Sequence, residues 1–217
     1  MDIRHLQNTT LFRGLTEAET EAALTALHAR ENAYRKGDIL LHAGSTTEDL
    51  GLVLEGSVSV ESNDMWGNRT LLNHVGKNQF FAETYAYLED APMLVDVIAN
   101  ENCRILFLRT GSLRNTVMPG ASWQGKLIAN LLTISSQKNL ALSGRSFHTA
   151  HKTIRRRVMS YLNAVALQKG STEFDIPFDR QQLADYLNVE RTALSKELGR
   201  MQKDGLLEIR KNHFHLL

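Results

Sequence analysis

The residues best suited to chemistry lie in one polar run near the C-terminal end of the chain. At helical spacing, this run places four polar side chains on one exposed face: Arg191, Thr192, Ser195 and Lys196. Arg191 can donate two parallel hydrogen bonds to O6 and N7 of guanine, Thr192 can contact the methyl group of thymine, and Lys196 can reach guanine or a phosphate. The face therefore predicts contacts with base edges of DNA, although solvated polar residues on a packed helix would have the same spacing.

Two short helices joined by a tight turn, within residues 179–207, are predicted to hold this face. Asp179 can cap the first helix with Gln182 completing a capping box, and Glu190 can cap or open the second. Gly205 follows the second helix as a stop signal. Each helix has one predicted buried stripe: Leu183, Ala184 and Leu187 on the first, and Leu194, Leu198 and Met201 on the second. This pattern is typical of a helix-turn-helix whose second helix lies in the major groove.

The last residues of the chain predict a β-hairpin beside these helices. Two short apolar runs at 206–209 and 214–217 enclose the basic turn 210–213. Such a wing rests on phosphates, and phosphate contacts fix a protein's position on DNA without reading sequence. Together, the helices and the wing give the candidate DNA-binding residues Arg180, Glu190, Arg191, Thr192, Ser195, Lys196 and Lys211.

The charge distribution agrees with a nucleic-acid-binding C-terminal part. Residues 1–143 carry a net charge of −4 and residues 144–217 a net charge of +5, and a phosphate-binding module is expected to be basic. A basic cluster stands at the start of the helix expected from about His148: Lys152, Arg155, Arg156 and Arg157. It could contact the DNA backbone, or it could be a solvated basic face.

Length and composition suit two small domains with apolar cores, because the chain has 217 residues and 42% of them are hydrophobic. The one cysteine, Cys103, excludes an internal disulfide and a cysteine-ligated cluster from a single chain. The sequence contains no run of 18 apolar residues and no signal-peptide core. We therefore expect a cytoplasmic protein without a membrane partner.

Short apolar runs separated by glycine turns between residues 34 and 108 predict an all-β sandwich, roll or barrel. The expected strands are 39–41, 52–54, 58–60, 70–72, 95–98 and 104–108, with a short helix or tight loop at 81–88. A helix capped by Thr16 and Glu19 is expected before these strands.

A longer helical pattern runs from Ala121 to about Leu142. Its apolar positions form a narrow seam at i, i+4, i+8 and i+11: Trp123, Leu127, Leu131 and Ile134. The seam predicts a coiled-coil-like contact between two copies, since two recognition helices must meet major grooves about 34 Å apart. Packing against the chain's own β domain is the alternative. A hinge is expected at Ser143–Ser146, followed by a helix from about His148.

The order of these parts resembles the Crp-Fnr superfamily of bacterial transcription regulators, over nearly the whole chain. The most specific stretches are YRKGDIL at 34–40, LEGSV at 54–58, FAET at 81–84 and VERTALSK at 189–196. The resemblance implies an α+β protein with three parts. These are an N-terminal double-stranded β-helix (jelly-roll) sensor domain at 1–118, a dimerisation helix and hinge at 119–145, and a winged helix-turn-helix domain at 146–217. It also implies a homodimer that binds palindromic promoter DNA, contacts RNA polymerase and responds allosterically to a small effector.

Departures from the family pattern concern the effector. In cyclic-nucleotide members, a Gly-Glu-Leu turn holds the ribose and a later Arg-Ser pair neutralises the phosphate. Here Glu83 matches the Glu, Ala82 replaces the Gly, and Met93 and Leu94 fall on the Arg-Ser positions. A buried phosphate without a cation is very costly, so the effector is predicted not to be a cyclic nucleotide. Oxygen-sensing members use several N-terminal cysteines, which Cys103 alone cannot replace.

The resemblance also bears on DNA recognition. Arg191 matches the family's guanine-reading Arg, whereas Thr192 stands where many members have Glu. A Glu there would accept a hydrogen bond from cytosine N4, so the half-site should differ from the usual one at that base pair.

The effector pocket is predicted to be apolar, suited to an uncharged or aromatic molecule, and formed by Glu83, Thr84, Tyr85, Met93, Leu94 and Leu127. One alternative within the fold is a haem-based gas sensor with axial ligands from His5, His28, His42 or His74; another is a regulator without a ligand. A cupin-like enzyme is the alternative from another class, but His42 and His74 are too few for its metal site, and no catalytic residues are visible. The sequence thus predicts a regulator that is not an enzyme and has no metal site.

Overall fold

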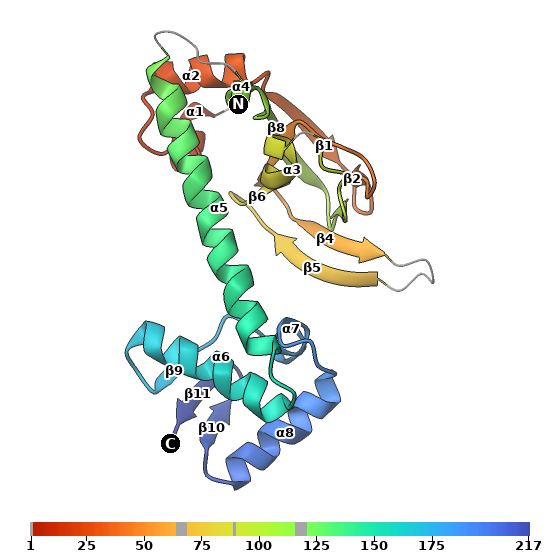
Figure 1. Cartoon of the computed structure of the whole chain (residues 1–217), viewed down its shortest axis with the longest axis vertical. Helices are drawn as coiled ribbons and strands as arrows, with labels where there is room; N and C mark the ends of the chain where they lie inside the picture. The colour runs from red at the N-terminus through yellow and green to blue at the C-terminus, as the bar shows by residue number, and fades with distance from the viewer. Residues whose placement is uncertain (1, 64–68, 89, 116–120) are drawn as a thin grey trace. The chain divides into compact units, whose positions relative to one another are not determined.

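The computed structural model describes residues 2–63, 69–88, 90–115 and 121–217 of the chain (Figure 1). The chain forms two compact units, Met1–Gln137 and Lys138–Leu217. The first contains the predicted β domain and the second the predicted winged helix-turn-helix, so the predicted fold class is confirmed. The domain boundaries near residues 118 and 145 stay a prediction.

Two four-stranded antiparallel sheets build the first unit (Figure 1). One sheet has the order β1-β8-β3-β6, with β1 at Arg30–Tyr34, β3 at Asp49–Glu55, β6 at Phe80–Phe81 and β8 at Cys103–Arg109. The other has the order β2-β7-β4-β5, with β2 at Ile39–Leu41, β4 at Val58–Asn63, β5 at Arg69–Val75 and β7 at Asp96–Ala99. All six predicted strands lie within or overlap these elements.

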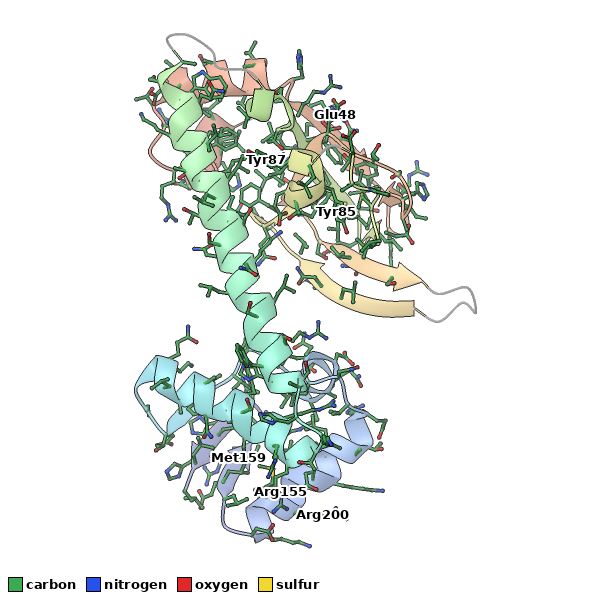
Figure 2. The ribbon with its side chains drawn as sticks, in the orientation of Figure 1. Glu48, Tyr85, Tyr87, Arg155, Met159 and Arg200 are labelled. Atoms are coloured by element: carbon green, nitrogen blue, oxygen red, sulfur yellow. The ribbon has the colours of Figure 1, made fainter. Side chains whose placement is uncertain are left out.

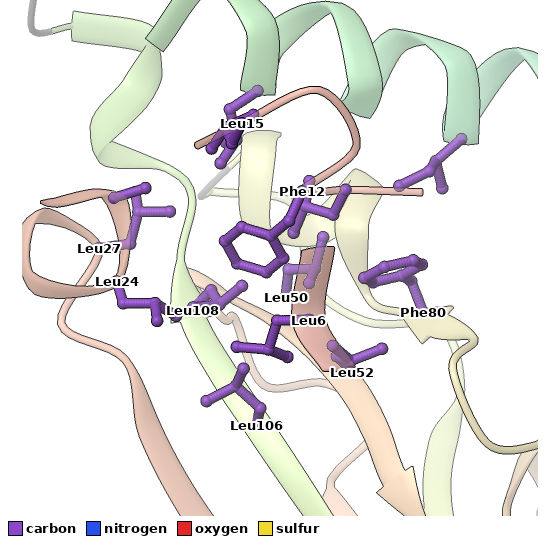
Figure 3. Packing of buried hydrophobic residues seen from close by; sticks show 14 of the residues in the cluster. Leu6, Phe12, Leu15, Leu24, Leu27, Leu50, Leu52, Phe80, Leu106 and Leu108 are labelled. Carbon is purple, nitrogen blue, oxygen red and sulfur yellow. The ribbon is translucent and has the colours of Figure 1, made fainter. Parts of the chain in front are cut away.

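Strand β3 explains how the first unit forms two apolar clusters. Successive side chains of a strand point to opposite faces of the sheet. Leu50 and Leu52 therefore pack with the helices, whereas Val53 joins a cluster that draws on strands of both sheets and so lies between them. Figure 3 shows the helix-side cluster, in which Leu6 and Phe12 lie beside the side chains of β3.

Among the described residues, four short helices accompany the sheets: α1 at Ile3–Gln7, α2 at Glu17–Ala26, α3 at Glu83–Leu88 and α4 at Ser112–Asn115. The predicted capping box of α2 is confirmed, because Thr16 Oγ1 accepts a hydrogen bond from the Glu19 N–H and Glu19 accepts one from the Thr16 N–H. Hydrogen bonds from Lys126 and Ser122 also reach Glu19 and, led by Lys126, lower the pKa of Glu19 to about 2. The N-terminus of α2 is thereby tied to the start of the long helix α5, Ser122–Thr149.

The predicted hinge at Ser143–Ser146 was wrong, because α5 is helical without a break from Ser122 to Thr149. Serine and glycine are poor helix formers, but tertiary contacts override this tendency. Arg145 in this stretch and His148 just after it contact neighbouring helices through hydrogen bonds and ring packing. The chain leaves the helix after Thr149, and α6 begins at Ile154 rather than near His148.

The seam that predicted a dimer contact packs within the chain itself. Trp123, Leu127 and Ile134 are buried in the core of the first unit, and Leu131 packs against that core. These four residues are therefore corrected from a dimer interface to intramolecular packing, which was the alternative. The same apolar cluster contains side chains of α1, α2 and β3, so a single chain buries Trp123, Leu127 and Ile134 without a partner and leaves Leu131 partly buried.

The second unit contains the predicted winged helix-turn-helix. Its elements are α6 at Ile154–Lys169, β9 at Glu173–Asp175, α7 at Arg180–Tyr186, α8 at Arg191–Lys203, β10 at Leu207–Arg210 and β11 at His213–Leu216 (Figure 1). The three strands form one antiparallel sheet in the order β10-β11-β9. The six residues of the two predicted buried stripes all lie in its core. One side of α8 therefore packs on the core of the second unit, and its opposite side is exposed.

Candidate DNA-binding face and effector region

Helix α7 and the turn after it have the predicted local structure. Asp179 Oδ1 accepts a hydrogen bond from the Gln182 N–H at 2.8 Å, and Gln182 Oε1 accepts one from the Asp179 N–H at 2.9 Å, which confirms the capping box. The turn to α8 passes through Asn188 in the left-handed region, at φ +52°. Asparagine tolerates this conformation better than most residues.

The N-terminus of α8 is capped by Glu190, as the sequence predicted. Its carboxylate accepts hydrogen bonds from the backbone N–H groups of Thr192 at 2.9 Å and Ala193 at 2.8 Å, and from the Thr192 hydroxyl. These bonds, led by that of the Thr192 hydroxyl, lower the pKa of Glu190. Because its hydroxyl donates to Glu190, Thr192 is left to present its methyl group. Glu190 thus shapes the face by capping the helix.

The exposed face of α8 carries the four predicted polar side chains, Arg191, Thr192, Ser195 and Lys196, all solvent-accessible. They lie in its first two turns, the part of a recognition helix that meets base edges. The opposite side is buried through Leu194, Leu198 and Met201. The structure therefore brings these four candidates together on a fixed surface.

Arg180 and Lys211 meet at the wing. The Arg180 Nη2 group donates a hydrogen bond to the Lys211 carbonyl at 3.3 Å, and the guanidinium lies over the Phe214 ring, 6.0 Å from its centroid. Burial lowers the pKa of Arg180. Arg180 thus connects the start of α7 to the wing turn, while the Lys211 side chain is exposed.

The basic cluster at the start of α6 has three different roles, which sequence reasoning could not separate. Arg155 forms ion pairs with Glu197 at 2.6 Å and Asp204 at 2.7 Å, and these bonds raise its pKa. Arg157 donates to backbone carbonyls of the helix-turn-helix turn. Lys152 and Arg156 are exposed. Arg155 and Arg157 are thus intramolecular links.

The predicted effector region lies around helix α3 (Figure 2). Met93 is 2% exposed and shares an apolar cluster with Tyr85, whose hydroxyl accepts a hydrogen bond from the Leu94 N–H at 3.3 Å. The Leu94 side chain is 78% exposed, so only its backbone takes part. Nearby in the chain, Glu83 is buried and Thr84 is exposed.

Leu127 does not join this region. It packs in the helix-side cluster of the first unit, separate from the cluster of Met93 and Tyr85. The prediction that Leu127 lines the same pocket is therefore wrong, because Leu127 of α5 packs on the opposite face of the sheet. Ala82, which precedes Glu83, has φ +60°, a left-handed conformation that glycine adopts more readily.

A cavity of about 280 Å³ lies elsewhere in the first unit. It is lined by Asp2, His5, Leu6, Glu31, Leu54, Glu55, Lys77 and Arg104, and none of the six predicted pocket residues is among them. His5 lines this cavity, whereas His28, His42 and His74 are exposed. A haem needs an axial ligand inside a pocket that encloses it, and ligand pockets usually measure about 300–1,000 Å³. These histidines therefore do not fit a haem.

Comparisons with known proteins agree with the two-part organisation. Residues 31–118 match the family of cyclic nucleotide-binding domains, and residues 156–217 match the family of Crp-like helix-turn-helix domains. The chain is similar to the cAMP-activated global transcriptional regulator CRP of Haemophilus influenzae, with 21% identity over 180 residues, covering 83% of this chain and 80% of the relative. In the part of the chain that the structure describes, no helix is long and apolar enough to span a membrane.

Solved structures show the same fold. The c-di-GMP responsive global regulator CLP of Xanthomonas campestris has a TM-score of 0.61 and 19% identity, covering 93% of this chain and 99% of that one. CprK complexed with OCPA has a TM-score of 0.66 and 15% identity, covering 89% and 88% of the two chains. At these identities, the likeness establishes the fold alone.

Proposed function

Since this chain belongs to the Crp-Fnr family of transcription regulators, which join a DNA-binding helix-turn-helix to an effector-binding domain, we propose three finer properties. The protein acts as a homodimer, it reads a palindromic DNA site through α8, and its effector is not a cyclic nucleotide. Contact with RNA polymerase, which the family implies, belongs to the same proposal.

The observation that carries this proposal is the exposed face of α8. Arg191, Ser195 and Lys196 stand on the first two turns of a helix whose opposite side is buried. An Arg at such a position can read guanine through two hydrogen bonds, and a Lys can anchor on guanine or phosphate. We assign base reading to Arg191, thymine contact to the Thr192 methyl group, and anchoring to Ser195 and Lys196.

Dimerisation is proposed through a second stripe of α5, next to the buried seam. Its six exposed residues follow the alternating three- and four-residue spacing of a coiled coil: Gly125, Ile128, Leu132, Ser135, Asn139 and Leu142. The stripe contains no charged side chain along about five turns of the helix. An uncharged, partly apolar helical stripe is suited to packing against an identical one, and Asn139 would help to fix its register.

Met93 stands where a cyclic nucleotide would need a cation. The family resemblance places a phosphate-neutralising Arg at this position, but Met93 is buried among apolar side chains that include Val53, Phe81 and Val97. A phosphate brought to this site would lose its hydration without gaining a cation. An uncharged or aromatic effector would not carry this cost.

The expected result of titrating the protein with cyclic AMP or cyclic GMP is no saturable heat of binding at millimolar ligand. The measurement is isothermal titration calorimetry with the full chain. The cAMP-activated regulator CRP of Haemophilus influenzae is the positive control in the same buffer. Micromolar binding of either nucleotide to this chain would contradict the effector proposal and leave the DNA-reading proposal untouched.

Replacing Arg191 with alanine should lower the affinity for the preferred duplex by about 5–150-fold, or about 1–3 kcal/mol, and relax the preference at one base pair in each half-site. The duplex is first selected by the wild-type protein from a random library, and a two-fold symmetric site is expected. Affinities are then measured at several salt concentrations, since phosphate contacts make binding fall steeply with salt. Enrichment of no duplex, or an unchanged base preference in R191A, would overturn the assignment.

A further inference from the structure

The end of α7 and the turn after it are bound by two arginines from other helices. Backbone N–H groups of the turn already donate to the carbonyls of residues 183, 184 and 185, and the two arginines add hydrogen bonds to the carbonyls around the end of the helix. Arg145 of α5 donates from Nε to the carbonyl of Tyr186 at 3.0 Å and from Nη2 to that of Asp185 at 2.9 Å. Arg157 of α6 donates from Nη1 to the carbonyls of residues 187 and 188 at 3.1 and 2.8 Å. Four consecutive carbonyls, 185–188, thus accept hydrogen bonds from guanidinium groups.

Both guanidinium groups are held in place by further contacts. The Arg145 guanidinium lies over the ring of Tyr186, 5.8 Å from its centroid. The Arg157 Nε donates to the His151 carbonyl at 2.7 Å. One turn after Arg145, the ring of His148 packs edge-on against Tyr161. Arg145 and Arg157, which together we call the arginine clamp, are therefore held within the packed second unit and are not mobile surface side chains.

We propose that Arg145 and Arg157 are positioning residues for DNA recognition, which fix the turn that aims α8. The inference rests on the proposed reading of DNA by this helix. The carbonyls they hold lead directly to Asn188, at φ +52°, and to the cap residue Glu190. A left-handed residue in a turn costs energy and needs such support to hold one geometry. A change in that geometry rotates Arg191 and Lys196 away from the bases.

The clamp also connects α8 to the long helix. Arg145 stands in the stretch Ser143–Ser146, whose serines and glycine favour helix only weakly. Its bonds to α7 exist only while this part of α5 is helical, because helical geometry sets the direction of its side chain. Unwinding the end of α5 would therefore break the two hydrogen bonds from Arg145 to the carbonyls of Tyr186 and Asp185, while those from Arg157 remain. In this way the helical conformation of the end of α5 affects the affinity for DNA through Arg145.

The decisive comparison is between Arg157 and its neighbour Arg156, which has the same charge and is exposed. Full-length R145A, R157A, R156A and the charge-conserving R145K and R157K are prepared. Hydrogen exchange is measured at the turn amides of Leu187, Asn188 and Val189, which bond back into α7. We expect exchange about tenfold faster or more in R145A and R157A, no change in R156A, and poor rescue by lysine, which lacks the planar fork.

The second readout uses the duplex selected by the wild type and a random duplex. R157A should lose about tenfold or more in affinity for the selected duplex and keep the wild-type salt dependence, because no phosphate contact is removed. A phosphate contact by Arg156 would be recognised differently. R156A would then bind both duplexes more weakly by the same factor, with a salt slope lower by about one. The lysine variants keep the charge and provide the test if the alanine variants do not fold.

Unchanged exchange at the turn in both R145A and R157A would overturn the proposal without reference to DNA. Equal loss on selected and random duplexes with a reduced salt slope in R157A would show a phosphate contact and overturn it as well. If the wild type selects no duplex, the proposed function fails, and the exchange data still decide whether the two arginines hold the turn.

Discussion

Leu132→Glu should convert the protein from a dimer to a monomer and lower its affinity for the selected palindrome by about 100-fold or more. Leu132 is 67% exposed in a single chain and lies at the centre of the uncharged stripe of α5. A glutamate there would place two carboxylates against each other in an apolar contact, which both desolvation and repulsion oppose. Two linked half-site contacts give an affinity about 10²–10⁴-fold higher than one contact alone, and a monomer loses this gain.

The oligomeric state of L132E is measured by native mass spectrometry or sedimentation velocity at the concentration used for DNA binding. Leu167→Glu is the matched control, because Leu167 is 86% exposed and lies on α6, off the stripe. L167E should remain a dimer and bind as the wild type does. A dimer of wild-type strength in L132E would place the contact between copies elsewhere on the chain.

The α5 helix shows where sequence reasoning succeeds and where it stops. The period of Trp123, Leu127, Leu131 and Ile134 correctly indicates a buried stripe, because burial follows helical period wherever one side is covered. What covers the stripe is decided by distant segments such as α1, α2 and β3, which the period does not contain. The seam was therefore assigned to a second copy although the chain's own core buries it.

The helix-turn-helix was predictable because its signals are local. The capping boxes and the Glu190 cap join residues two or three positions apart, and the buried stripes repeat within single helices. Arg145 and Arg157 gave no such signal, since their acceptors lie 41 and 30 residues away along the chain. The left-handed backbone of Ala82 has only an indirect marker, the glycine that the family pattern has at this position, because alanine itself does not favour this conformation.

Gly51→Ala should destabilise the first unit by about 3 kcal/mol, the upper end of the usual cost of overpacking a core. Gly51 in β3 pairs with Phe81 in β6, and the ring of Phe81 lies directly over its Cα. An added Cβ would lie 2.1 Å from Phe81 Cζ, a distance that two carbon atoms cannot reach. The ring has little room to retreat, because it is buried and packs edge-to-face on Phe107, with centroids 6.1 Å apart.

The stability of G51A is followed by tryptophan fluorescence in urea, since Trp123 is buried in the core of the first unit. Gly76→Ala is the matched control, because nothing lies closer to its added Cβ than Gln79 Oε1 at 3.9 Å, and its effect should stay within about 0.5 kcal/mol. If the clash with the ring is the cause, G51A should cost less in a Phe81→Leu background than in the wild type, because the smaller side chain makes room. A full cost of G51A in that background would mean that the glycine is needed for another reason than the approach of Phe81.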